Sequence, residues 1–213
     1  AKAHLQAARE TGDPDHFESI SSAHDRMERI IRDVLTLTRG DAVVDPSERV
    51  SIERAATDAW QSVETDRATL ERSDSLPTTA ADPDRVRRLF ENLFRNSVEH
   101  GSTDNRRGSA GRTVERGSEA EDALDRDDEV TPESSVTITV GPLEDGFYVA
   151  DDGPGIPPGE REVVFEPGYS TGDGGTGLGL AIVERIVAAH DWEMDLTTAE
   201  RGGVRFEIRF HSR

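Results

Sequence analysis

The chain has 213 residues, of which 44 are acidic and 25 basic, so its formal net charge at pH 7 is -19. A surface this negative repels nucleic acids and anionic membranes, which makes both poor partners. The absence of cysteine excludes disulfides, thiolate metal sites and a cysteine nucleophile. The length suits one sizeable domain, or one domain with a smaller helical piece.

Two interpretations fit the acidic, lysine-poor composition. Lys2 is the only lysine, and an acidic, arginine-for-lysine composition is typical of a protein from a high-salt cytoplasm, where salt screens self-repulsion. A merely acidic mesophilic protein with high-GC codon usage is the alternative. No apolar run approaches the roughly 20 residues of a membrane span, and there is no signal-peptide pattern. The sequence therefore predicts a soluble cytoplasmic piece, with any membrane sensor outside it.

The first 40 residues predict a helical hairpin. Residues 17–39 form one amphipathic helix, because apolar positions recur at spacings of three and four. Residues 1–9 are also predicted to be helical, and the short turn between the two favours an antiparallel pair. Two helices cannot bury so wide a stripe alone. Residues 1–40 are therefore expected to form a dimeric four-helix bundle with a second copy, or to pack on the rest of the chain.

Residues 45–213 predict one α+β domain with an insertion. Helices are expected at 50–63 and at 82–100, the second opened by the capping carboxylate of Asp82 and a proline. Short strands are expected at 68–70 and 76–78. Residues 102–135 hold almost no apolar side chain and are interpreted as a disordered insertion; a docking loop is the alternative.

After the insertion, alternating apolar residues predict two β-hairpins around one helix, at residues 178–190. The strands are expected at 136–140, 147–151, 193–198 and 204–210. The first hairpin places Asp151 at a strand end. The predicted architecture is an α/β sandwich, a mixed sheet with helices on one face.

Two glycine-rich turns are the most informative stretches. Asp151 leads into the turn Asp152-Gly153-Pro154-Gly155-Ile156-Pro157, and Gly175-Thr176-Gly177-Leu178-Gly179 opens an apolar helix. Bare backbone N–H groups at a helix N-terminus bind phosphate well. Either turn alone fits an ordinary loop of an α/β domain, but the pair favours a phosphate site.

Asn92 and Asn96 lie four residues apart on the helix 82–100, so their carboxamides share one face, away from the apolar face. A carboxamide oxygen is a suitable hard ligand for Mg²⁺, which is commonly shared with nucleotide phosphates. One solvated asparagine and one capping a neighbouring loop would also fit.

The order of these segments resembles the sensor histidine kinases of two-component systems. The four matching motifs are an N box at Glu91-Asn92-Leu93-Phe94-Arg95-Asn96-Ser97, a G1 box at Asp151-Asp152-Gly153-Pro154-Gly155, an F box at Val164-Phe165-Glu166-Pro167, and a G2 box at Gly175-Thr176-Gly177-Leu178-Gly179. The match covers residues 47–210 apart from the insertion. It implies the Bergerat ATP-binding fold, which is shared with gyrase-like ATPases.

The resemblance also implies roles for residues. Asp151 would accept a hydrogen bond from the adenine amino group, and Asn96 would hold Mg²⁺ between the phosphates. Residues 167–179 would form a mobile lid over the triphosphate. The implied ATP-binding residues are Asn92, Asn96, His100, Asp151, Gly153, Gly155, Gly175, Thr176, Gly177, Leu178 and Gly179.

The chain departs from that family at three places. No histidine has the context of the phosphoacceptor, and His24 lies on the wrong helix, so the acceptor is expected upstream of Ala1 in a longer protein. Glu99 stands where the family often has a lysine that meets phosphate, so Arg95 or a solvent cation must supply that charge. Asn92 stands where gyrase-like hydrolases carry a general-base glutamate, so ATP hydrolysis should be slow.

The sequence thus predicts the catalytic region of a cytoplasmic sensor histidine kinase. It would bind Mg-ATP, phosphorylate a histidine on an attached helix, and pass the phosphoryl group to a receiver-domain aspartate of a response regulator. A homodimer through the hairpin is expected. The alternatives are a non-catalytic nucleotide-binding scaffold, or another ATPase or serine kinase of the same fold.

Overall fold

A computed structural model describes residues 12, 14–38, 48–63, 65, 68–73, 75–101, 135–170 and 175–211. The predicted helix at residues 1–9 lies outside this part of the chain, and so does the predicted insertion apart from Ser135. The helix predicted at residues 17–39 is confirmed as α2 (Pro14–Thr38), a single long helix, while the hairpin stays a prediction.

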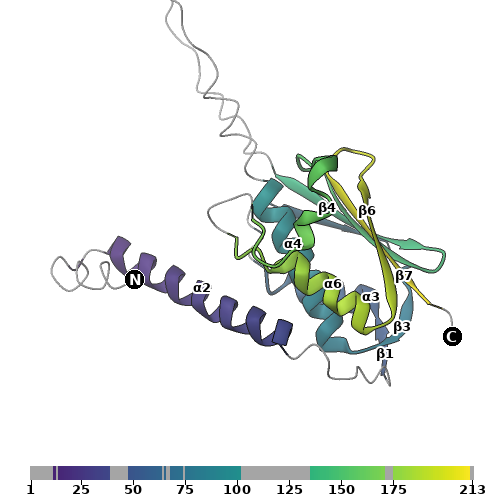
Figure 1. Ribbon diagram of the computed structural model, residues 1–213, viewed down its shortest axis with the longest axis horizontal. Coiled ribbons are helices and arrows are strands. Elements are labelled where there is room, and N and C mark those ends of the chain that lie inside the picture. Colours follow the sequence, from purple (N-terminus) through teal and green to yellow (C-terminus); the bar gives the residue numbers. More distant parts are fainter. Residues whose placement is uncertain are drawn as a thin grey trace, which may run out of the picture.

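The main sheet has five strands in the order β2–β4–β5–β7–β6 (Figure 1). They span Ala68–Arg72 (β2), Val136–Leu143 (β4), Gly146–Asp151 (β5), Trp192–Thr198 (β6) and Val204–Phe210 (β7). Strand β2 runs parallel to β4, and the other neighbours are antiparallel. The predicted mixed sheet and both hairpins are therefore confirmed.

Three helices, α3 (Ile52–Trp60), α4 (Pro83–Gly101) and α6 (Gly179–Ala189), lie on one face of this sheet (Figure 1). Two 3-10 turns, η1 (Pro158–Glu160) and η2 (Val163–Phe165), lie between β5 and α6 in the sequence. The arrangement is the predicted α/β sandwich.

Two predicted boundaries are wrong, at 50–63 and at 76–78. Val50 and Ser51 belong to strand β1 (Glu48–Ser51), and the second predicted strand is displaced to β3 (Thr78–Ala81). These two strands pair with each other in a separate antiparallel ladder. The serine at the end of β1 also caps α3, because its hydroxyl accepts the Arg54 N–H at 3.3 Å. A pairing partner distant in sequence overrode the local helical pattern.

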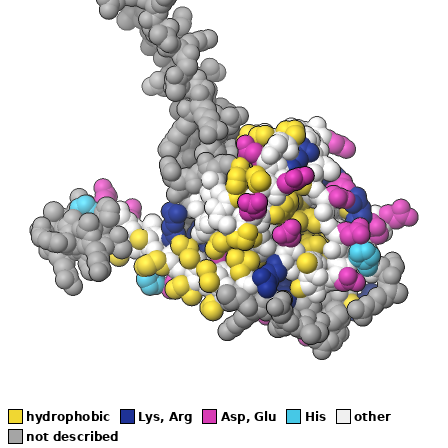
Figure 2. All heavy atoms as spheres, in the orientation of Figure 1, with side chains coloured by type: hydrophobic (Ala, Val, Ile, Leu, Met, Phe, Trp, Pro, Cys, Tyr) yellow, Lys and Arg dark blue, Asp and Glu magenta, His cyan; other side chains and the backbone are white. Residues whose placement is uncertain are grey.

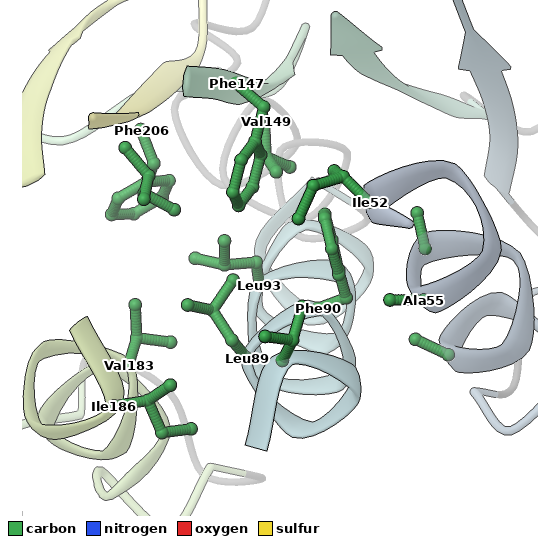
Figure 3. Packing of buried hydrophobic residues seen from close by; sticks show 14 of the residues in the cluster. Ile52, Ala55, Leu89, Phe90, Leu93, Phe147, Val149, Val183, Ile186 and Phe206 are labelled. Atoms are coloured by element: carbon green, nitrogen blue, oxygen red, sulfur yellow. The ribbon is translucent and has the colours of Figure 1, made fainter. Parts of the chain in front are cut away.

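The core lies between the three helices and the sheet. Figure 3 shows side chains of α3, α4 and α6 converging on β5 and β7. Phe90 of α4 is fully buried, and its ring centroid lies 5.2 Å from that of Phe147 on β5 and 5.5 Å from that of Phe94. Alternate residues of β4 face this core, so Val136, Ile138 and Val140 are buried while the threonines between them are partly exposed. The helix and strand periodicities thus meet in one apolar layer.

Helix α2 contacts α6 and forms ion pairs with α4, while part of it projects from the domain (Figure 1). Its predicted apolar stripe stays largely uncovered within the described residues, and hydrophobic side chains gather along it in Figure 2. The exposed members are Phe17, Met27, Ile30, Ile31, Val34 and Leu35.

His190 joins the end of α6 to the start of α4. Its Nε2 accepts the backbone N–H of Asp82 at 3.1 Å, and its Nδ1 lies 2.8 Å from the carbonyl oxygen of Ile186. The ring stacks on Trp192 at 4.5 Å between centroids. Because Nε2 must accept, this arrangement needs the neutral ring with its proton on Nδ1.

We expect His190 to make folding stability depend on pH. Burial lowers its pKa from the ordinary 6.5, against the opposing effects of the Ile186 carbonyl and Asp82, while Arg85 also lowers it. The unfolded chain then binds the proton more readily, so this contribution is present above pH 6.5 and is lost as pH falls toward the lower folded pKa. The loss should approach one hydrogen bond, about 1 kcal/mol.

Urea unfolding at pH 7.5 and 5.5 measures this effect. His190→Phe keeps a ring against Trp192 but cannot titrate, so its unfolding midpoint should fall less between the two pH values than that of the unsubstituted chain. An equal fall in both chains would contradict the role given to His190.

Candidate functional site

Asp151 ends strand β5 and is the centre of a hydrogen-bond cluster. Its Oδ1 accepts the N–H groups of Gly153 and Val204, each at 3.1 Å, and its Oδ2 accepts the Ser97 hydroxyl at 2.8 Å. A carboxylate offers about four acceptor positions on its two oxygens. Donors from the described residues use three of them, which leaves one position on Oδ2 for a further donor.

The turn after Asp151 packs tightly on the turn between β6 and β7. Gly203 has φ +77°, and a Cβ there would lie 2.2 Å from the carbonyl oxygen of Asp151. Gly155 has φ +79°, and a Cβ added there would lie 3.3 Å from the Gly203 carbonyl oxygen. Glycine is therefore required at position 203, because a side chain would displace the backbone that carries the carboxylate.

The predicted shared face of Asn92 and Asn96 is covered by the start of α6. A Cβ on Gly179 would lie 3.2 Å from Asn96 Oδ1 and 3.3 Å from Asn92 Oδ1. Asn92 is only 3% exposed, and its Nδ2 donates to the Arg88 carbonyl oxygen at 2.8 Å. A solvated role for Asn92 is therefore wrong: both carboxamide oxygens face the N-terminus of α6.

The second glycine-rich turn brings both ends of the predicted lid together. The Gly168 N–H donates to the Gly177 carbonyl oxygen at 2.8 Å, and Gly177 adopts φ +68°. Thr176 Oγ1 accepts the Leu178 N–H at 3.3 Å, just before α6 begins. No side chain of the described residues caps α6, so the first N–H groups of this helix can bind an anion.

The remaining candidate residues lie on α4 and α2. His100 is exposed in the last turn of α4. Arg95 is half-buried, and its pKa is lowered first by burial and then by Arg29, although a guanidinium stays charged in proteins. His24 is exposed on α2, with Nδ1 3.5 Å from Glu28. The structure thus gathers the predicted residues of the four motifs around α4 and the start of α6.

Sequence reasoning gave no role to three residues that hold Asp151. Ser97 lies within the N box but was not singled out, and Gly203 and Val204 come from the β6–β7 turn, some 50 residues further along the chain. The doublet Gly202-Gly203 was the available signal, since paired glycines before a strand often mark a tight turn.

The family described as "Histidine kinase-, DNA gyrase B-, and HSP90-like ATPase" matches residues 81–213, more than half of the chain. The chain belongs to this family of ATP-binding domains. The predicted Bergerat fold and the resemblance to sensor histidine kinases are confirmed at this level.

Curated relatives include sensor kinases. Sensor histidine kinase ZraS of Klebsiella oxytoca is 30% identical over 193 residues, which cover 85% of this chain and 35% of the relative. Sensor histidine kinase CpxA of Escherichia coli K12 is 28% identical over 217 residues, covering 94% of this chain and 40% of the relative. The chain thus spans well under half the length of these relatives.

Solved structures show the same fold. The Acinetobacter baumannii histidine kinase AdeS has a TM-score of 0.62 at 16% identity, covering 99% of this chain and 93% of that one. The mycobacterial sensor histidine kinase MprB has a TM-score of 0.54 at 22% identity, covering 76% of this chain and 94% of that one.

No helix among the described residues is both long and apolar enough to cross a membrane. No cluster of three or more histidine and carboxylate side chains among them could hold a metal ion.

The tight turn at Gly203 can be tested by substitution, with the neighbouring Gly202 as the control position. Gly203→Ala should destabilise the chain by more than the roughly 1–3 kcal/mol of a strained backbone, because the methyl group also meets the Asp151 carbonyl. Gly202→Ala should cost the strain alone, since at φ +89° its nearest neighbour is 4.0 Å away.

Thermal unfolding and ATP titration of both variants test this. ATP affinity should fall for Gly203→Ala and stay near the original value for Gly202→Ala. Equal effects at the two positions would contradict the account of the turn.

Proposed function

We propose that this chain binds Mg-ATP and transfers the γ-phosphoryl group to a histidine on a helical hairpin, for relay to a response-regulator aspartate. The observation that carries the proposal is the pair of sites along α4. Near the C-terminal turns of α4, the Asp151 carboxylate has an acceptor position for a further donor. Along the side of α4, the carboxamide oxygens of Asn92 and Asn96 face the N-terminus of α6.

In this proposal, Asp151 binds the adenine. The exocyclic amino group of adenine is a donor, and the remaining acceptor position on Oδ2 would receive it. Gly153 supports the assignment, because a bare backbone beside Asp151 Oδ1 leaves room for a flat base.

The phosphate end rests on the start of α6 and on Asn96. The uncapped N–H groups of the helix would bind phosphate oxygens. Mg²⁺ fits the donor set, because it accepts a few oxygen ligands together with phosphates and waters. Asn96 Oδ1 would bind the ion, and Asn92 Oδ1 lies nearby on the same helix. An ion bound there would neutralise part of the phosphate charge.

The residues favour phosphoryl transfer over hydrolysis. Transfer depends mainly on positioning and on charge neutralisation. Asn92 presents a carboxamide, which cannot take a proton from water, and its nitrogen is held by the Arg88 carbonyl.

Helix α2 suggests which partners the protein binds. Its exposed apolar stripe fits a four-helix bundle with a second copy, which would bury the side chains left uncovered here. A response-regulator receiver domain would take the phosphoryl group from that bundle.

We expect Asp151→Asn to weaken adenine binding about a hundredfold or more while leaving the fold intact. The asparagine oxygen can still accept the Gly153 and Val204 N–H groups, and the Ser97 hydroxyl can turn to accept from the new amide. The amide would however present a donor to the adenine amino group. Titration with Mg-ATP and with adenosine measures the loss.

Asp152→Asn is the matched control for this variant. Asp152 Oδ1 accepts the Thr137 N–H at 2.7 Å, which an asparagine oxygen can also do. Its adenine affinity should therefore stay unchanged. Unchanged affinity in Asp151→Asn would remove the role given to that carboxylate.

The reaction is tested by mixing the chain with γ-labelled Mg-ATP and a separate hairpin peptide that carries the acceptor histidine, in high salt. Acid-labile, base-stable phosphate on the peptide is expected, and none on a peptide with histidine replaced by glutamine or when Mg²⁺ is chelated. ATP binding without transfer would indicate a scaffold, and rapid release of free phosphate a hydrolase.

A further inference from the structure

Glu99 places a negative charge at the phosphate end of the candidate site. It follows Asn92 and Asn96 on the same side of α4, at the spacings of four and three that align residues on a helix. A Cβ on Gly175, at the start of the second glycine-rich turn, would lie 3.8 Å from Glu99 Oε2. A carboxylate here would repel the triphosphate that the neighbouring N–H groups attract.

Helix α2 supplies cations at this point. Arg29 Nη1 lies 3.6 Å from Glu99 Oε1, and each side chain is about one third exposed. One turn earlier, Arg26 Nη2 donates to the Gly175 carbonyl oxygen at 3.5 Å. Two guanidinium groups of one helix thus meet the end of α4 and the start of the second glycine-rich turn.

A buried ion pair holds α2 in this position. Asp33 is 4% exposed, and its Oδ1 accepts Arg88 Nη2 of α4 at 2.9 Å. A carboxylate buried to this degree requires its partner, because the uncompensated charge would be costly. Asp33 follows Arg29 by one turn, so its pairing with α4 also places Arg29 beside Glu99.

Arg95 does not replace Arg29 in this role. It is half-buried on α4, where burial lowers its pKa and Glu99, Asp33 and Glu91 all oppose that effect. Its charge is therefore shared among several carboxylates on both helices. Arg29 brings a guanidinium from outside α4 to the Glu99 carboxylate.

We propose that Arg29 is a positioning residue that neutralises Glu99, so that the site binds the nucleotide triphosphate more tightly while α2 is docked on α4. The inference rests on the proposed ATP binding and extends it. Nucleotide affinity then reports the position of α2, and a movement of that helix that separates Arg29 from Glu99 would weaken ATP binding without altering the adenine end.

The test is a titration of the whole chain with Mg-ATP and, separately, with adenosine, which carries no phosphate. At about 0.1 M salt, Arg29→Ala should weaken Mg-ATP binding about five- to tenfold and leave adenosine affinity unchanged. Arg32→Ala is the matched control, because Arg32 lies on the same helix, is well exposed and pairs with Glu28. Its Mg-ATP affinity should stay within twofold of the original.

The double variant Arg29→Ala with Glu99→Gln distinguishes neutralisation from direct phosphate contact. Mg-ATP affinity should return to within twofold of the original, because the negative charge that Arg29 offsets is also gone. Asp33→Asn should weaken Mg-ATP binding like Arg29→Ala, since it releases α2 from α4 while Glu99 remains.

Three outcomes would overturn the inference: unchanged Mg-ATP affinity in Arg29→Ala, no recovery in the double variant, or an equal loss of adenosine affinity. An unsubstituted chain that binds adenosine but not Mg-ATP would instead refute the proposed function, and the inference with it. The thermal midpoint without nucleotide should be nearly equal for Arg29→Ala and Arg32→Ala, because both side chains are partly exposed.

Discussion

The rest of the structure depends on how α4 is packed between the sheet and α6. One side of this helix buries Leu89, Phe90 and Leu93 against the sheet and its neighbours, so the helix cannot rotate without opening the core. Because that side is fixed, the adjoining side of the helix presents Asn92 and Asn96 to the start of α6.

The same constraint joins the two ends of the candidate site. Ser97, in the last turns of α4, donates to Asp151, and Glu99 meets α2 near the second glycine-rich turn. A small displacement of α4 would therefore move the Asp151 carboxylate, which we propose to bind adenine, and would also change the charge beside the second glycine-rich turn. The buried Asp33–Arg88 pair adds α2 to this unit, which gives a helix outside the sandwich a physical connection to the nucleotide site.

Most elements could be predicted locally, because their apolar spacing matches the surface they bury. The period of the helix that carries Phe90 and the alternation around Ile138 both predicted the correct element and the correct buried side. The predictions failed at Val50, where strand β1 forms only because β3 lies beside it. The roles of Ser97 and Val204 were equally invisible, since each depends on a contact more than 50 residues away in the sequence.

The sequence by itself determined the family, the order of the motifs and the chemistry of the candidate site, because these depend on residue types at short spacings. The acidic composition that favours a halophilic protein stays a prediction. Only the tertiary structure decided which charges meet. The sequence suggested Arg95 or a solvent cation as the positive charge near Glu99, whereas folding brings Arg29 to within 3.6 Å of it, because the burial of Asp33 against Arg88 docks α2. Such pairings depend on packing between distant segments, which local periodicity does not encode.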